Sequence, residues 1–408
     1  MQIDKEYEEA IRFFLDTSLK IPENTEDTLE ELVLNIAKPF TSYIKKASKE
    51  KENYLFDTPV YGWWNVTSAC NFRCIHCLYN DTEYASKNDL SHEQSMNLID
   101  ELVNDFGVVQ MLLTGGEIFT RSDIMDIIRK FKENNVVLKL LTNASLLKDS
   151  QISELAELLN PYTDMITISL DGATNETFKK IRQTDTFEKI KSNIKKLVEH
   201  NINVSTACTV NTVNYNEVLD TYKLSANLGV KYFSAGKIIV HNESHTNLAV
   251  PDRDLFLLHK KLMQNEVKGT KMFPLFHSPM DILNKEECRK ILEEEKYQGL
   301  LNKYRQKVLS RTCHCHDRFA IQSDGRIYLC LSAAAEDVEA LGSYKEKSLL
   351  EVWENRKNNK LFQPRVIENM VCNKCRYNKY CNSGCVVKSY LRTKDINSPQ
   401  IPCQGWQH

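Results

Sequence analysis

The sequence predicts an α/β protein whose core is a parallel sheet covered by helices. Between residues 61 and about 240, short apolar or β-branched runs alternate with stretches of helical periodicity. Repeats of this kind imply parallel strands joined by crossover helices. The chain has 408 residues, enough for two to three domains, and 42% of them are apolar, so it can bury a sizeable core. Six repeats fit either an open partial barrel or a doubly wound sheet, and periodicity alone does not choose between them.

The elements follow from local patterns. Apolar residues at helical spacing, such as Ile3, Tyr7 and Ile11, predict a short helical region at the N-terminus. Strands are expected at 61–67, 108–113, 136–142, 165–170, 204–210 and 231–240. Helices are expected at 91–105, 122–134, 150–159, 187–200 and 214–227. Ser91 is a suitable cap for the first of these helices.

The remainder of the chain has a different character. Residues 250–310 are charged and predict helices, whereas from residue 313 onward turns, short strands around 319–329 and paired cysteines dominate. So small an apolar core is typical of a segment that needs metal to fold. The expected divisions are 1–58 (helical region), 59–245 (α/β domain), 246–312 (helical linker) and 313–408 (cysteine-rich domain).

The charge balance excludes several partners. Lys plus Arg (53) nearly equals Asp plus Glu (55), giving a net charge of -2. This balance argues against nucleic acid or an anionic membrane as the main partner. No apolar run approaches the roughly 18–20 residues of a transmembrane helix, and the N-terminus is too acidic and polar for a signal peptide. We therefore expect a cytoplasmic protein.

The thirteen cysteines are the anomaly of the composition. In a reducing cytosol they favour metal or redox chemistry over disulfides. Cys208 and Cys288 stand alone, and lone cysteines are more often buried apolar residues than ligands. The others form one group early in the chain and one in its last quarter: Cys70, Cys74, Cys77, then Cys313, Cys315, Cys330, Cys372, Cys375, Cys381, Cys385 and Cys403.

The first group is suited to an iron–sulfur cluster. Cys70-x3-Cys74-x2-Cys77 follows the first strand, at the edge where parallel α/β folds bind ligands. Three thiolates can hold three corners of a cubane cluster and leave one iron without a protein ligand. Structural zinc would need a fourth ligand, and His76, directly beside Cys77, is awkwardly placed to supply it. An open iron indicates chemistry rather than a structural role.

Polar groups end the following strands on the same side of the sheet. Each alone is consistent with a turn or a cap, but together they favour a ligand site. They are Gly115-Gly116-Glu117 after the second strand, Asn143 after the third, Ser169 and Asp171 at the end of the fourth, and Arg182 on the next helix.

The cysteine motif with Gly115-Gly116-Glu117 closely resembles the radical S-adenosylmethionine (SAM) enzymes over about residues 60–245. The resemblance implies a partial (β/α)6 TIM-like barrel that carries a [4Fe–4S] cluster and binds SAM at its open iron. It also implies one-electron cleavage of SAM to methionine and a 5′-deoxyadenosyl radical that abstracts hydrogen. A strong reductant of the flavodoxin or ferredoxin type is then required as a partner.

Site residues carry over from this resemblance position by position. Glu117 and the Gly115-Gly116 backbone would contact the methionyl amine, Ser169 and Asp171 the ribose, and Arg182 the carboxylate. His76 would lie beside the adenine, and Asn143 would belong to the same cofactor-binding set. Two positions depart from the family pattern: Ile118 stands where proline is common, and Ala144 where glycine often follows the asparagine.

The C-terminal cysteines resemble the SPASM domain, which holds two auxiliary clusters in some radical SAM enzymes. This resemblance implies three [4Fe–4S] clusters in all. One auxiliary cluster would take Cys313, Cys315, Cys330 and Cys385, and the other Cys372, Cys375, Cys381 and Cys403. Because Cys313 and Cys315 are so close in sequence, one of them would be spare if this cluster has an open iron. A pair of zinc ribbons is the alternative for this segment.

SPASM-bearing radical enzymes mostly modify peptides and proteins, so the resemblance favours maturation of a ribosomally made precursor peptide through a thioether or carbon–carbon crosslink or a related oxidation. Residues 1–58 look short for a leader-binding module, which leaves the leader to a separate partner or to the barrel mouth. Alternatives are a tetrapyrrole or small-metabolite enzyme and an anaerobic sulfatase maturase, although Leu331 stands where that enzyme would need an aspartate. A non-catalytic electron carrier or zinc-binding protein is the rival class.

Acid–base groups outside the cofactor site are weakly indicated. Lys237 and His241 are the candidates at the end of the sixth expected strand, and Thr209 and Asn211 those at the end of the fifth. Tyr328 and Asp324 are no better supported. A lone lysine or histidine at such a position is more often a cap or a surface residue.

Overall fold

The computed structural model describes residues 58–77, 86–240, 243–273, 318–366, 370–374 and 384–399, with single residues at 5, 6, 8, 9, 12, 275, 288, 291 and 294. His241 and the cysteines 313, 315, 375, 381 and 403 lie outside the described residues, so the predictions made for them are not examined by the structure.

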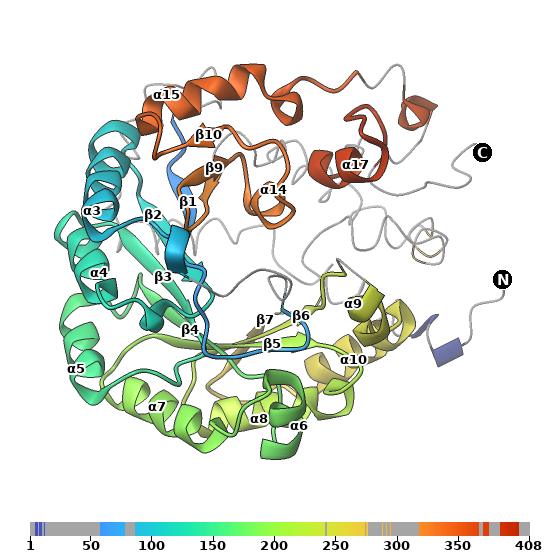
Figure 1. Cartoon of the computed structure of the whole chain (residues 1–408). Coiled ribbons are helices and arrows are strands. Elements are labelled where there is room, and N and C mark those ends of the chain that lie inside the picture. Colours follow the sequence, from blue (N-terminus) through green and yellow to red (C-terminus); the bar gives the residue numbers. More distant parts are fainter. Residues whose placement is uncertain are drawn as a thin grey trace.

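One curved sheet forms the centre of the molecule (Figure 1). Its strands are hydrogen-bonded in the order β10-β9-β8-β1-β2-β3-β4-β5-β6-β7. Their bounds are β1 Tyr61–Thr67, β2 Gln110–Gly115, β3 Val137–Thr142, β4 Met165–Ser169, β5 Val204–Val210, β6 Tyr232–Lys237, β7 Lys271–Phe273, β8 Arg318–Ile321, β9 Arg326–Tyr328 and β10 Gly342–Ser343.

The strand order decides between the two predicted architectures. Strands β1 to β6 lie side by side in sequence order, and every neighbouring pair among them is parallel. A doubly wound sheet reverses its strand order at a switch point, whereas here each crossover advances in the same direction. Crossovers of one hand then place all their helices on one face of the sheet. The partial-barrel prediction is confirmed.

The helices follow one another around the outside of the sheet (Figure 1). Ser91 and Gln94 form a capping box at the start of α3, which confirms the predicted cap, and a π-helical turn at Leu102–Phe106 continues that helix. The helices are α3 His92–Glu101, α4 Ile124–Glu133, α5 Asp149–Leu158, α6 Asn175–Arg182, α7 Phe187–Glu199, α8 Val218–Asn227, α9 Glu243–Leu248, α10 Asp252–Gln264, α14 Leu331–Ala335, α15 Leu349–Glu354 and α17 Val386–Thr393.

Strands from the C-terminal segment belong to the same sheet as the barrel. β8 pairs in parallel with β1, so that Gly62 lies opposite Phe319. A Cβ on Gly62 would come within 2.3 Å of the Phe319 ring, so only glycine fits there. That ring meets Phe106 edge-on at 5.6 Å, and Phe106 in turn meets Trp353 at 5.9 Å. Barrel and C-terminal segment therefore share one apolar core.

Two details differ from or extend the sequence predictions. Residues 250–310 were expected to be helical, but Lys271–Phe273 form β7, because their exposed–buried–exposed alternation fits an edge strand beside β6. Cys208 and Cys288 are both buried, as predicted for isolated cysteines. None of the helices in the described part of the chain is long and apolar enough to cross a membrane.

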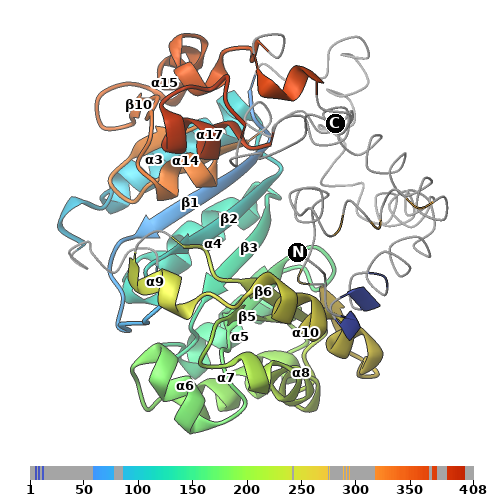
Figure 2. The same ribbon diagram turned by 90° about the vertical axis from the view of Figure 1, so that its right-hand side faces the viewer.

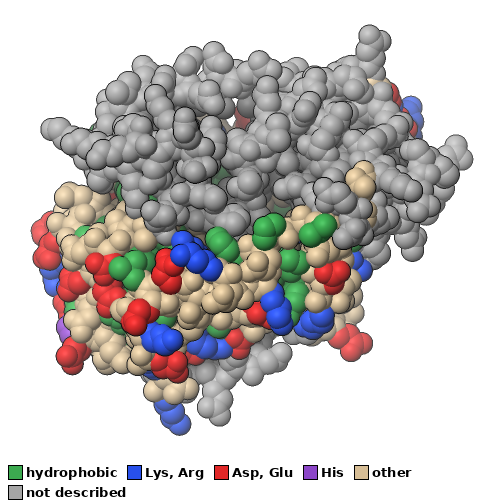
Figure 3. All heavy atoms as spheres, turned by 90° about the horizontal axis from the view of Figure 1, so that it is seen from above, with side chains coloured by type: hydrophobic (Ala, Val, Ile, Leu, Met, Phe, Trp, Pro, Cys, Tyr) green, Lys and Arg blue, Asp and Glu red, His purple; other side chains and the backbone are tan. Residues whose placement is uncertain are grey.

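Figures 2 and 3 show the molecule from two further sides. In Figure 2, α14 and α17 lie beside the barrel strands at the end of the molecule where β1 runs. In Figure 3, basic and acidic side chains are interspersed over the described part of the face seen from above. This mixture agrees with the balanced charge of the sequence.

Phe319→Ala tests the shared core. Because the ring is fully buried, its removal should lower the free energy of unfolding by about 3–5 kcal/mol. Anaerobic urea denaturation measures the effect. Tyr162→Ala, at a side chain that is 84% exposed, is the control and should change stability by less than about 0.5 kcal/mol. Equal effects of the two substitutions would contradict the shared core.

Candidate functional site

The carboxyl ends of the barrel strands surround a cavity of about 250 Å³, here called the cofactor cavity. It brings together most of the residues that the sequence singled out. Those that line it are Cys70, Cys74, His76, Cys77, Gly115, Gly116, Asn143, Ser169 and Arg182. Asn65, Thr114, Gln322 and Ser323 line it as well and were not predicted.

The cysteine loop is fastened by its backbone. The Ile75 amide donates to the carbonyl of Ile181 in α6 at 3.0 Å, and the Cys77 amide donates to the Cys74 carbonyl at 3.1 Å. The Arg182 guanidinium donates to Cys74 Sγ at 3.4 Å. Burial raises the pKa of the Cys74 thiol, and the nearby guanidinium opposes that rise. The loop thus holds its sulfur atoms around the cavity with a cation beside one of them.

The glycine pair is required by the close approach of two strand ends. The Gly116 amide donates to the Thr67 carbonyl at 2.9 Å, and the Glu117 amide donates to the Ala69 carbonyl at 2.8 Å. A Cβ on Gly116 would lie 2.2 Å from the Ala69 carbonyl oxygen. The end of β2 is therefore fixed against the segment that leads from β1 into Cys70.

Glu117 joins the ends of β2 and β3. Its Oε1 accepts hydrogen bonds from Thr142 Oγ1 at 2.6 Å and from the Phe119 amide at 3.1 Å, and its Oε2 accepts from the Asn143 amide at 2.6 Å. Burial raises the pKa of Glu117, and these hydrogen bonds oppose the rise. The carboxylate is 1% exposed and is not among the residues lining the cofactor cavity. Its contact to a methionyl amine stays a prediction.

Asp171 holds Arg182 and His76 in place. The fully buried Asp171 carboxylate forms an ion pair with Arg182, accepts a hydrogen bond from the Thr209 amide at 2.6 Å, and lies 3.7 Å from His76 Nε2. Burial lowers the pKa of His76 to about 4, so the imidazole is neutral at pH 7. Asp171 does not line the cavity, so the geometry gives it positioning contacts, and the ribose contact predicted for it stays a prediction.

The residue set fits an iron–sulfur cluster and a bound nucleoside. Three thiols line one cavity. His76 Nδ1 and Arg182 Nε lie buried beside it without a hydrogen-bond partner among the described residues, as groups awaiting a ligand do. Within the described ranges no three His, Cys, Asp or Glu side chains are arranged around a single metal ion. A four-iron cubane is larger than one ion and accepts more widely separated thiolates.

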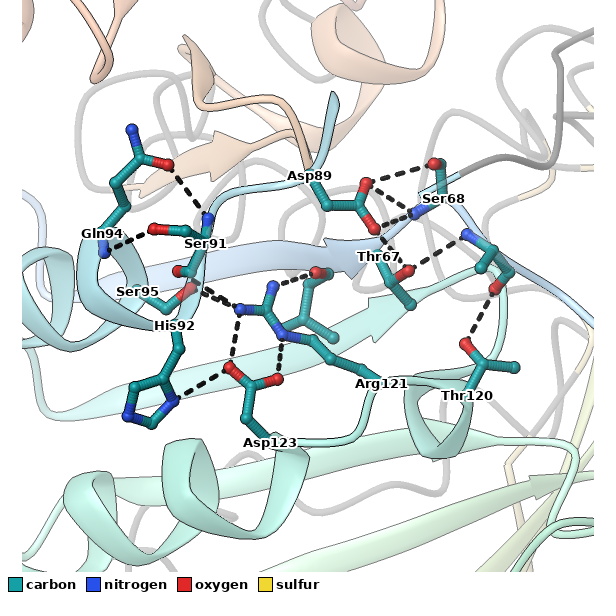
Figure 4. A network of polar contacts seen from close by, with 12 residues as sticks. Thr67, Ser68, Asp89, Ser91, His92, Gln94, Ser95, Thr120, Arg121 and Asp123 are labelled. Atoms are coloured by element: carbon teal, nitrogen blue, oxygen red, sulfur yellow. Dashed lines mark hydrogen bonds and ion pairs between the residues drawn. The ribbon is translucent and has the colours of Figure 1, made fainter. Parts of the chain in front are cut away.

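A partly buried network of ion pairs and hydrogen bonds at the carboxyl end of β1 was missed by the sequence reasoning (Figure 4). Arg121 pairs with Asp123 at 2.6 Å and donates to the Val66 carbonyl at 2.7 Å and to Ser95 Oγ at 2.6 Å. Asp89 completes the network by accepting a hydrogen bond from Thr67 Oγ1 at 2.6 Å. These contacts fix the carboxyl end of β1, from which the cysteine loop departs.

One of the cavity-lining residues that was not predicted could have been identified from the sequence. Thr114 is the penultimate residue of β2 and Asn143 follows β3, so the rule that polar residues collect at strand ends identifies Thr114. Gln322 and Ser323 come from the turn after β8 and had no such signal, because their approach depends on the pairing of β8 with β1.

The acid–base candidates do not meet at the cofactor cavity. Lys237 lines a separate cavity of about 350 Å³ with Asp252. The Thr209 amide is bonded to Asp171, and the Asn211 side chain donates to the Thr209 carbonyl at 2.9 Å.

Two C-terminal candidates have partners of their own. Asp324 is bonded to Arg326 at 2.8 Å, and the hydroxyl of the buried Tyr328 is hydrogen-bonded to Asp337. Neither residue lines the cofactor cavity.

Three of the C-terminal cysteines fall among the described residues. Cys330 immediately precedes α14 and Cys385 immediately precedes α17, and both sulfurs pack against the apolar core. Cys372 is buried. The amide end of a helix stabilises a thiolate, which suits Cys385 to metal ligation.

A second cavity, here called the inner cavity, adjoins the first. Its volume is about 280 Å³, and it lies between the inner face of β1 to β3 and the helices α14 and α17. Asn65, Thr114 and Leu141 line both cavities. The two cavities therefore adjoin across these three residues.

Comparison with known families agrees with this geometry. Residues 64–225 match the radical SAM superfamily, and residues 313–382 match the SPASM iron–sulfur cluster-binding domain. The chain is 25% identical over 350 residues to the AdoMet-dependent heme synthase of Methanosarcina barkeri, covering 83% of this chain and 95% of that protein. It is 33% identical to a probable GTP 3′,8-cyclase of Saccharolobus islandicus, covering 40% of this chain and 52% of the cyclase.

Solved structures share the fold. Streptococcus suis SuiB bound to S-adenosylmethionine superposes with a TM-score of 0.67 at 16% identity, covering 99% of this chain and 94% of SuiB. SuiB bound to the precursor peptide SuiA gives 0.66 at 16% identity, with 90% and 80% covered. Native anSMEcpe with bound AdoMet gives 0.58 at 17% identity, with 85% and 93% covered.

Arg121→Met tests the network at the carboxyl end of β1. The side chain is only 8% exposed and is hydrogen-bonded to Asp123, Val66 and Ser95, so its loss should cost about 1.5–3 kcal/mol of unfolding free energy. The matched control is Arg129→Met, whose side chain is 42% exposed and pairs with Asp126 at 2.8 Å. That substitution should cost less than about 1 kcal/mol. Similar losses in anaerobic urea denaturation would contradict a special role for Arg121.

Proposed function

The chain is a radical SAM enzyme with a C-terminal SPASM domain, and we propose that it oxidatively modifies a residue of a ribosomally made peptide. The observation that carries the proposal is the inner cavity, which shares the wall of Asn65, Thr114 and Leu141 with the cofactor cavity. A substrate C–H bond seated beside these three residues would lie next to the cofactor, as hydrogen abstraction needs.

Iron–sulfur clusters and SAM follow from the two matched domains. We propose that Cys70, Cys74 and Cys77 hold the cluster that binds SAM. When bound, this pair supplies one-electron cleavage of SAM to methionine and a 5′-deoxyadenosyl radical. Arg182 would contribute positive charge beside Cys74, and the neutral His76 would offer its ring to the adenine. The backbone at Gly115 and Gly116 would receive the methionyl group.

A peptide substrate fits the inner cavity better than a tetrapyrrole does. Its volume of about 280 Å³ is large enough for one side chain of a peptide whose backbone stays outside. A haem-type tetrapyrrole also carries several carboxylates, whereas Lys388 is the one cation among the described lining residues. The fold shared with SuiB, a protein seen bound to a precursor peptide, is consistent with this choice.

A tetrapyrrole substrate is the second candidate. It is favoured by the likeness to the heme synthase, which extends over 95% of that protein. Sulfatase-type maturation is less well supported, because the residue after Cys330 is Leu331, whose side chain lines the inner cavity and cannot serve as a base.

The electron balance gives the auxiliary clusters a role. We propose that a flavodoxin- or ferredoxin-type donor supplies one electron for SAM cleavage. Hydrogen transfer from the substrate to the 5′-deoxyadenosyl radical yields 5′-deoxyadenosine and a substrate radical. Closing a thioether or carbon–carbon bond from that radical releases one further electron and one proton. The two proposed SPASM clusters, ligated by the C-terminal cysteines, would accept that electron.

The substrate proposal is tested with the short peptides encoded beside the gene for this enzyme. Anaerobic incubation with SAM and dithionite should lower the mass of one peptide by about two hydrogens and yield stoichiometric 5′-deoxyadenosine. Coproporphyrin-type substrates are assayed in parallel. Modification of the tetrapyrrole but of no peptide would reject the peptide proposal in favour of the second candidate.

A Cys70→Ala/Cys74→Ala/Cys77→Ala variant tests the cluster assignment. It should lose all 5′-deoxyadenosine formation and about a third of its iron, because only the SAM-binding cluster of three is removed. Iron analysis and EPR of the reduced protein measure the remaining clusters. Cys208→Ala is the control and should keep both activity and iron, since that cysteine is buried in the core. Retained 5′-deoxyadenosine formation in the triple variant would rule out the assignment.

A further inference from the structure

We propose that the inner cavity selects a large, uncharged, apolar side chain as the residue to be modified. The inference rests on the proposed function, since it assumes a peptide substrate, and adds the chemical class of the side chain and the residues that read it.

The walls of the inner cavity are apolar on both sides. Trp63 and Leu112 on the barrel strands form one wall, with Leu141, which also lines the cofactor cavity. Val387 and Leu391 of α17 form the opposite wall. An aliphatic or aromatic side chain placed between them would bury apolar area on every side, at about 25 cal/mol for each Å² removed from water.

Two polar residues, Asn65 and Thr114, lie at the junction of the inner cavity with the cofactor cavity. Asn65 Nδ2 donates to Gln322 Oε1 at 2.5 Å, and Gln322 Nε2 donates to the Ala334 carbonyl of α14 at 2.7 Å. These hydrogen bonds fix the Asn65 side chain at the junction, where a substrate C–H bond would lie nearest to the cofactor.

The charges at the cavity disfavour an ionised substrate side chain. Glu336 and Lys388 are the two charged residues among its described lining, and they have opposite signs. Neither an acidic nor a basic side chain would meet a net opposite charge there. Burying either between Leu112 and Leu391, away from Glu336 and Lys388, would cost several kcal/mol.

Apolar side chains at the mouth extend the same preference outward. Ile239 is 54% exposed and Leu331 is 38% exposed, and both line the inner cavity. Val240 is 48% exposed and follows Ile239 directly, but it does not line the cavity. Ile239 and Val240 therefore form a matched pair for mutagenesis, because only Ile239 lines the inner cavity.

The experiment enlarges the mouth residues. Ile239→Phe should lower kcat/KM for modification of the encoded peptide by at least about 10-fold and raise the Kd of a fluorescent peptide analogue by a similar factor. The new side chain has three more carbons, and a change of one methylene in such a pocket already has an effect of about this size. Val240→Phe should change either quantity less than about 2-fold. Both positions are exposed, so folding should be unaffected, and thermal unfolding with iron content verifies this.

A second series changes the peptide. Replacing the modified residue with alanine should reduce modification by the wild-type enzyme but partly restore relative activity with Ile239→Phe, a reversal that a structural defect does not produce. Replacement with aspartate or lysine should abolish modification by both enzymes.

The outcomes separate the two proposals. If the wild type modifies a peptide but accepts aspartate or lysine equally well, or if Val240→Phe is as damaging as Ile239→Phe, the side-chain assignment is wrong and the peptide function stands. If the wild type forms 5′-deoxyadenosine but modifies no peptide, the proposed function fails and the assignment fails with it.

Discussion

The position of the cysteine loop depends on the hydrogen bonds between the carboxyl ends of β1 and β2. Thr67 and Ala69 accept from the amides of Gly116 and Glu117, an approach so close that neither Gly115 nor Gly116 could carry a Cβ. The Glu117 carboxylate then fixes the end of β3 by accepting hydrogen bonds from Thr142 Oγ1 and the Asn143 amide. These contacts join strand ends of one sheet. The sulfur atoms are therefore held as rigidly as the barrel strands, and not as loosely as in an unsupported loop.

The same arrangement of strand ends places charged side chains in the interior of the protein. Carboxylates and guanidinium groups lie below the cavity where water cannot screen them, so each must be compensated within the protein. Arg182 is paired with Asp171 and contacts Cys74, while Arg121 is paired with Asp123 and bonded to the β1 carbonyl of Val66. Loading a cluster at the cysteines requires thiolates, and Arg182 supplies a compensating positive charge where burial alone favours the neutral thiol.

The sequence was most informative where the chemistry is local. Every expected barrel strand forms, and Gly115, Gly116, Asn143 and Ser169 meet at one cavity because parallel strands bring their carboxyl ends together. The contacts that were not predicted join residues that lie far apart in the sequence. Gln322 reaches the site only because β8 pairs with β1. Arg121 bonds to Ser95 of α3 because α3 packs against α4, the helix that follows Arg121. No periodicity in a single sequence reports such pairings.

The membership of β8 in the barrel sheet makes the C-terminal segment part of the site. The chain runs from β8 through Gln322, at the cofactor cavity, and through β9 to Cys330, where α14 begins. Helix α14 supplies Leu331 and Ala335 to the inner cavity, and its Ala334 carbonyl accepts the hydrogen bond from Gln322. A proposed cluster ligand, Cys330, and a residue that lines the inner cavity, Leu331, are therefore adjacent in one short segment. The segment that supplies part of the cavity wall would then also carry a ligand of the proposed electron acceptor.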